Sequence, residues 1–107
     1  MAEHINTTEE EQVRLLKCIG EANRLRILKN IINEEKCVTD IVNAIGKEQS
    51  LISHHLKHLK DCNIVVAQQR AKKIYYSLSH PRLAEIITQS EKLVKELPIC
   101  QEKEGNE

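Results

Sequence analysis

The side chains of this 107-residue chain best suited to chemistry are its four cysteines and five histidines. Thiolates and imidazoles bind zinc and softer metal ions. His54 and His58 stand four residues apart, the spacing of a zinc-hydrolase helix. That chemistry needs a Glu base directly after the first histidine, and His55 occupies the position. We therefore predict that the protein is not an enzyme.

The cysteines are spread along the chain with no Cys-x-x-Cys pair. The N-terminus is polar and acidic, and no apolar run is long enough to span a bilayer, so we expect a cytoplasmic protein without a membrane partner. Thiols stay reduced in the cytoplasm, which argues against a structural disulfide framework. Cys37 precedes a predicted helix and lies near its N-terminus, where the thiolate form is favoured.

Residues 38–59 predict two short helices joined by a tight turn, the pattern of a helix-turn-helix. Gly46 follows the first apolar helix face, where a helix end often needs a left-handed residue. In the second helix, Ile52, Leu56 and Leu59 form an inward stripe. The opposite face suits the major groove of DNA and carries Gln49, Ser50, Ser53, His54 and Lys57. An ordinary helical hairpin with a solvated polar face would show the same spacing.

A predicted β-hairpin follows the second helix. Asn63 suits a helix end, residues 64–66 and 74–78 favour strands, and residues 68–73 form a polar, basic tip. We expect this hairpin to be the wing of a winged helix-turn-helix, with Arg70, Lys72 and Lys73 along the phosphate backbone. A basic tip also keeps a sheet edge soluble, so it is not specific to DNA binding.

The charge distribution favours a nucleic-acid partner although the formal net charge is zero. Residues 47–82 hold seven Lys or Arg against two acidic residues, which gives this segment a charge of +5 and the remainder −5. Such a basic face is the electrostatic footprint of a DNA-binding protein. A protein-interaction module without DNA is the other class that the pattern allows.

The flanking segments predict one domain over residues 1–100, with a disordered acidic tail at 101–107. Thr8 and Glu11 predict a capping box for a first helix, and Ser79 with Pro81 predicts the start of a last helix. Both helices carry apolar residues at three- and four-residue spacing. We expect a homodimer through the first and last helices, although they could instead cover one monomer's core.

From residue 16 to residue 97 the chain resembles the ArsR/SmtB family of prokaryotic metal- and stress-responsive repressors. Four segments carry the resemblance: NRLRILKNI, KCVTDIVNAIG, QSLISHHLKHLKDCNIV and KKIYYSL. It implies a mainly α winged-helix homodimer that binds a double-stranded DNA operator and responds to a small effector. The family's DNA-reading face matches Gln49, Ser50, Ser53 and His54. Val42 and Ala71 depart from the family pattern, which has a small Ala and often Gly at these places.

The resemblance also implies where an effector would act. Zinc-responsive relatives carry Cys-Val-x-Asp, here Cys37 and Asp40, and take further ligands from the partner's N-terminal arm, here His4. A mixed S/N/O site of this kind suits zinc. Asp40 could instead charge a helix start, and His4 could belong to a frayed terminus. The arsenite-type Cys-Val-Cys is incomplete, because Thr39 replaces the second thiol.

A thiol switch is the competing hypothesis for the effector. Some relatives sense reactive sulfur or oxidants through two cysteines, and Cys37 with Cys100 could pair if their Cα atoms lie within about 7 Å. The family's last-helix metal site matches residues 80, 82, 93 and 96, where Arg82 and Leu93 offer no donor, so we expect that site to be lost. Cys18 and Cys62 are expected to be small buried apolar residues.

Overall fold

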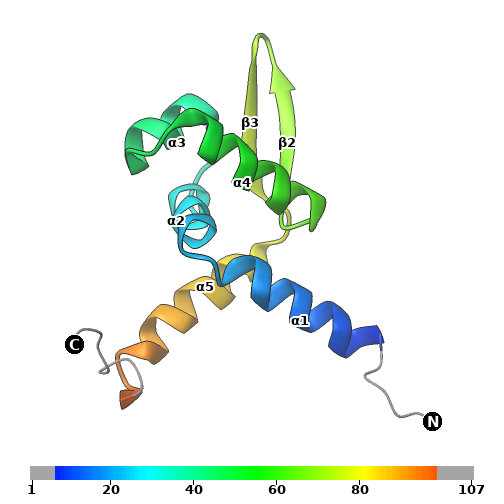
Figure 1. Cartoon of the computed structure of the whole chain (residues 1–107), viewed down its shortest axis with the longest axis vertical. Helices are drawn as coiled ribbons and strands as arrows, with labels where there is room; N and C mark the ends of the chain where they lie inside the picture. The colour runs from blue at the N-terminus through cyan, green and yellow to red at the C-terminus, as the bar shows by residue number, and fades with distance from the viewer. Residues whose placement is uncertain (1–6, 99–107) are drawn as a thin grey trace.

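The computed structural model describes residues 7–98 as five helices and three short strands. The elements in chain order are α1 (Thr7–Ile19), α2 (Ala22–Ile31), β1 (Lys36–Cys37), α3 (Val38–Ile45), α4 (Gln49–Asp61), β2 (Val65–Arg70), β3 (Lys73–Leu78) and α5 (Pro81–Val94). In Figure 1, α2, α3, α4 and the β2–β3 hairpin form one body, from which α1 and α5 extend to opposite sides. The predicted winged helix-turn-helix is confirmed. The predicted domain end at residue 100 and the tail lie outside the described residues.

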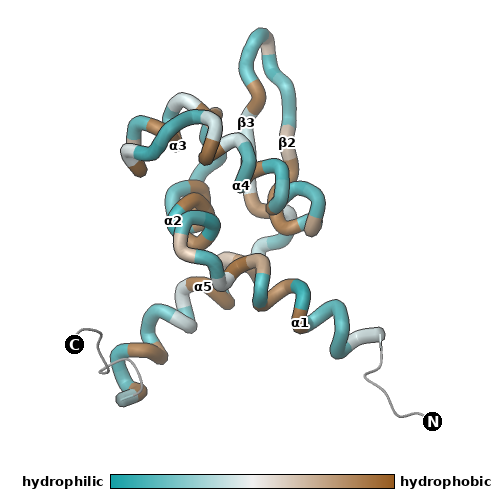
Figure 2. Tube along the Cα trace, in the orientation of Figure 1, coloured by the Kyte–Doolittle hydropathy of each residue, from teal (hydrophilic) through white to brown (hydrophobic). Residues whose placement is uncertain are grey.

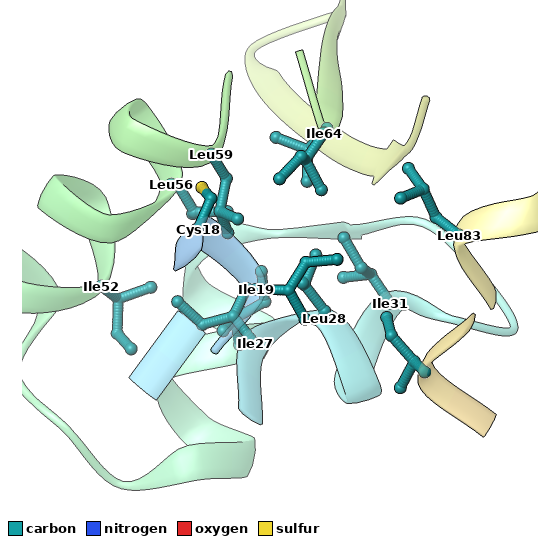
Figure 3. Packing of buried hydrophobic residues seen from close by; sticks show 13 residues of the cluster. Cys18, Ile19, Ile27, Leu28, Ile31, Ile52, Leu56, Leu59, Ile64 and Leu83 are labelled. Carbon is teal, nitrogen blue, oxygen red and sulfur yellow. The ribbon is translucent and has the colours of Figure 1, made fainter. Parts of the chain in front are cut away.

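The core is aliphatic and joins every helix. Ile52, Leu56 and Leu59 of α4 are fully buried, as their spacing predicts. They pack against Ile27 and Leu28 of α2, and α5 adds to the same cluster (Figure 3). Among residues 7–98 no helix is both long and apolar enough to cross a membrane.

The sheet has the order β1-β3-β2, with both pairs antiparallel. The hairpin register runs from Val65 opposite Leu78 to Arg70 opposite Lys73. The third strand was not predicted from the sequence: β1 has two residues and places Cys37 opposite Tyr75. Its pairing attaches the start of α3 to the wing.

Among residues 7–98, three backbone positions with positive φ shape the helix-turn-helix and the hairpin. Gly46 (φ 80°) ends α3, and its N–H donates to the carbonyl of Val42. Asn63 (φ 63°) follows α4 as expected. Ala71 (φ 55°) lies in the hairpin turn, in a conformation that a Gly would adopt without a Cβ penalty.

Two predicted helix caps are wrong. Thr8 lies inside α1, which already includes Thr7, so Thr8 and Glu11 do not form a capping box at the start of this helix. The N-cap of α5 is His80, whose Nδ1 accepts a hydrogen bond from the Arg82 N–H at 3.1 Å. The Ser79 hydroxyl instead donates to the Asn63 carbonyl at 2.7 Å, which ties the start of α5 to the end of α4.

Candidate DNA-binding face and thiol cluster

The second helix of the motif, α4, buries one face and exposes the other. Because its aliphatic stripe points into the core, the polar side chains must face solvent. All five residues predicted to read DNA are exposed, namely Gln49, Ser50, Ser53, His54 and Lys57. The Lys57 ammonium lies 3.0 Å from the carboxylate of Asp61, one turn along the helix, so its charge is partly balanced at the surface.

The three predicted wing cations differ in their surroundings. Lys72 and Lys73 are exposed at the hairpin tip. Arg70 instead forms a two-point ion pair with Glu35, in which Nη1 contacts Oε2 and Nη2 donates to Oε1 at 2.8 Å. Its guanidinium also lies 5.2 Å from the centre of the Tyr75 ring. This pair lowers the pKa of Glu35 and raises that of Arg70.

Two of the predicted effector residues are brought together. The Cys37 thiol is 5% exposed and donates to the carboxylate of Asp40 at 3.4 Å. Cys37 is also the residue that precedes α3, as predicted. His4 and Cys100, the other members of the predicted metal and redox sites, lie outside the described residues.

A second thiol cluster lies between α1 and the end of α4. The ligand atoms of Cys18, His58 and Cys62 all lie within 4.8 Å of one another. Burial raises the pKa of the Cys18 thiol to about 11, and a hydrogen bond with Cys62 adds to this shift. The sequence offered one usable signal, the four-residue spacing of His58 and Cys62. It could not show that Cys18, forty residues earlier, would meet them.

His55 lies on the buried side of α4, and its Nδ1 has no hydrogen-bond partner among the described residues. The nearest charge is the Glu21 carboxylate, 3.8 Å away. Glu21 caps α2 by accepting from the Arg24 N–H at 2.8 Å, and this hydrogen bond lowers its pKa. Burial lowers the pKa of His55 from its usual 6.5, and Glu21 offsets this shift only in part.

We expect the protein to lose stability as the pH falls below about 6.5, the pKa of an exposed histidine. Below that pH the unfolded chain binds a proton at His55 that the folded chain does not, so the free energy of unfolding decreases. The decrease continues until the pH passes the lowered folded-state pKa. Urea denaturation at pH 7.5 and 5.5 measures it. The pH dependence should shrink in His55→Gln and persist in His54→Gln, and an equal change in both variants would contradict the assignment.

Comparisons with known proteins agree with this architecture. A sequence model of the family described as "Bacterial regulatory protein, arsR family" matches residues 21–66, from the residue before α2 into β2. The structure of HlyU from Vibrio cholerae superposes with a TM-score of 0.77 at 26% identity, covering 83% of this chain and 97% of HlyU.

Two curated relatives extend the match beyond the helix-turn-helix. The transcriptional regulator NmtR of Mycobacterium tuberculosis is 35% identical over 75 residues, which are 70% of this chain and 62% of NmtR. The uncharacterized regulator MJ1325 of Methanocaldococcus jannaschii is 38% identical over 89 residues, 82% of this chain and 96% of MJ1325. This chain thus spans slightly less than two thirds of NmtR and nearly all of MJ1325. It belongs to the ArsR family of transcriptional regulators, which are not enzymes.

Proposed function

We propose that the protein is a homodimeric, sequence-specific DNA-binding repressor that contacts duplex operator DNA with α4 and the wing. The observation that carries this proposal is the exposed polar face of α4, together with the exposed Lys72 and Lys73 of the hairpin. Figure 1 shows that α4 lies beside this hairpin. An α-helix fits the major groove, where hydroxyl, amide and imidazole groups can bond base edges. Lys72 and Lys73 would then contact phosphates, which contribute affinity without sequence information.

The proposed dimer is supported by apolar side chains that the monomer leaves exposed on its two extended helices. In Figure 2, brown apolar segments recur along α1 and α5 outside the main body. The exposed large residues are Val13 and Leu16 of α1, and Ile86, Leu93 and Val94 of α5. Burying such side chains against a second copy is favourable by about 25 cal/mol per Å² of apolar surface. A two-fold dimer would also present two copies of α4 to one duplex.

The proposed signal is a metal ion or a thiol-reactive compound that acts at the Cys37 end of α3. Cys37 and Asp40 supply one sulfur and one oxygen donor. A zinc site takes four ligands, so completion requires donors from elsewhere, for which His4 is the candidate. Cys100 is the candidate partner if the signal is oxidative. A constitutive regulator would show neither response.

Salt dependence separates this proposal from a protein-interaction module without DNA. Contact with phosphates releases counterions, so the logarithm of the affinity falls linearly with the logarithm of salt, by about 0.9 per phosphate. We expect this salt dependence when binding to a fluorescently labelled duplex is measured by fluorescence anisotropy. Replacing Lys72 and Lys73 with Ala should make the slope shallower by about two. A salt-independent affinity, or no duplex binding, would contradict the proposal.

Releasing Arg70 from its ion pair should have the opposite effect. In Glu35→Gln the guanidinium loses its carboxylate partner and becomes available to a phosphate. We expect tighter duplex binding and a salt slope steeper by about one. The measurement is the same anisotropy titration at several salt concentrations.

Glu34→Gln is the matched control because it removes the same charge from the neighbouring exposed residue. Glu34→Gln should change duplex affinity only through the change in net charge. Equal steepening in the two variants would show that Arg70 does not reach the phosphate backbone.

A further inference from the structure

The cluster of Cys18, His58 and Cys62 has the composition of a metal site. It offers two sulfur atoms and one imidazole nitrogen, and these donor atoms lie within 4.8 Å of one another. Around a tetrahedral zinc ion, with bonds of about 2.3 Å to sulfur and about 2.0 Å to nitrogen, neighbouring ligand atoms would be roughly 3.5–3.8 Å apart. Small side-chain rotations are therefore sufficient to close the site.

The fold holds the two sides of this cluster in place before any ion binds. His58 and Cys62 are one turn apart, and the Cys62 N–H donates to the His58 carbonyl at 3.0 Å. Cys18 is 2% exposed and belongs to the same core cluster as Leu56 and Leu59 (Figure 3). The carbonyl of Cys18 also accepts a hydrogen bond from Arg24 Nε at 2.7 Å. The backbone around both cysteines is thus fixed by packing and hydrogen bonds.

An ion can reach the cluster from solvent. All three side chains line a cavity of about 400 Å³ between α1 and α4. His58 is exposed and Cys62 half-buried, so the site is open on one side and leaves a coordination position for water. Arg14, Lys17 and Arg24 line the same cavity. Arg24 only partly offsets the burial that raises the pKa of the Cys18 thiol to about 11, so an ion that binds there must displace the thiol proton.

We propose that Cys18, His58 and Cys62 bind one thiophilic metal ion of the zinc type. Two sulfurs and an imidazole select borderline or soft ions such as Zn²⁺ and Cd²⁺, whereas Mg²⁺ and Ca²⁺ require oxygen donors. None of these residues belongs to the Cys37–Asp40 pair, so this would be a separate site. A Cys18–Cys62 disulfide is the alternative use of the two thiols.

The position of the site suggests what the ion does, a step that rests on the proposed DNA-binding function. His58 and Cys62 lie at the end of the helix proposed to read DNA, and Cys18 lies on a helix proposed to form the dimer. An ion would link these two helices and so change how the two copies of α4 are held relative to each other. We expect metal to change operator affinity by about 5- to 150-fold, the usual range of coupling between two sites.

The binding test uses the reduced full-length chain carrying Cys37→Ser and Cys100→Ser, in which Cys18 and Cys62 are the remaining cysteines. We expect titration with Cd²⁺, monitored by the thiolate-to-metal charge-transfer absorption, to saturate at one equivalent of Cd²⁺ per chain. Adding Cys62→Ser should abolish most of the absorption. Adding His58→Ala, an exposed position that does not affect the core, should weaken the affinity at least about tenfold. The proposed site would be overturned if the protein with only Cys18 and Cys62 showed no such absorption, or if His58→Ala left its Cd²⁺ affinity unchanged. Loss of both thiols in the absence of metal would also overturn it.

The regulatory step is tested separately with the same protein and labelled operator duplex, with and without one equivalent of Zn²⁺. A change in operator affinity on adding Zn²⁺ that is absent in the His58→Ala protein supports the coupling. An operator affinity that Zn²⁺ does not change overturns it. If the protein binds no duplex either with or without Zn²⁺, the proposed DNA-binding function fails, while the metal titration still decides whether the site exists.

Discussion

Replacing Ser53 and His54 together with Ala should weaken binding to a selected operator duplex by about 30-fold or more. Both side chains are exposed on the polar face of α4 and neither supports the core. Each specific contact with a base edge is worth about 1–3 kcal/mol, so the loss of two corresponds to at least this change. Affinity for unrelated duplex should change little, because phosphate contacts supply most of it.

The matched control is Thr88→Ala with Lys92→Ala, which trims two exposed side chains on the solvent face of α5. This control should retain operator affinity, and both double variants should unfold at the same urea concentration as the unchanged protein. Equal affinity of the two double variants for the operator would show that α4 does not read its sequence.

Introducing charge into the exposed apolar faces should break the proposed dimer. Leu16 and Leu93 are 55% and 51% exposed in the monomer, so Glu at these positions does not disturb the core. In a two-fold dimer each substitution occurs twice, and each buried leucine contributes about 1.5–3 kcal/mol. We expect the dimer dissociation constant of Leu16→Glu/Leu93→Glu to rise by about 1,000-fold or more. Sedimentation equilibrium at micromolar concentrations measures it.

Thr88→Glu provides the control, because it places a carboxylate on the opposite face of α5. This variant should remain dimeric. A dimer that survives the double substitution would place the interface elsewhere, and a monomeric unchanged protein would remove the dimer from the proposal.

The local features of the fold could be predicted from the sequence. The apolar spacing of Ile52, Leu56 and Leu59 defines the buried side of α4, and this also fixes which residues are exposed. Gly46 and Asn63 mark helix ends because few other residues adopt a left-handed conformation at low cost. The resemblance to a known family placed these pieces in one architecture.

The features that could not be predicted depend on contacts between residues distant in the sequence. Glu35 neutralises Arg70 across the hairpin, and no spacing rule pairs them. The strand β1 has two residues, which is too short to give an alternating pattern. Cys18 is the small core residue that the sequence predicts, but only the packing of α1 against the end of α4 brings it to His58 and Cys62.

The most direct test of the central claim, that two copies of α4 read one duplex, is selection of bound sequences from a random duplex pool. We predict enrichment of an inverted repeat whose half-sites have centres about 34–36 Å apart, one helical turn of DNA or a multiple of it. The Ser53→Ala/His54→Ala protein should enrich no such repeat. The claim would be contradicted if the unsubstituted protein enriched no sequence from the pool, or if it enriched a single half-site without symmetry.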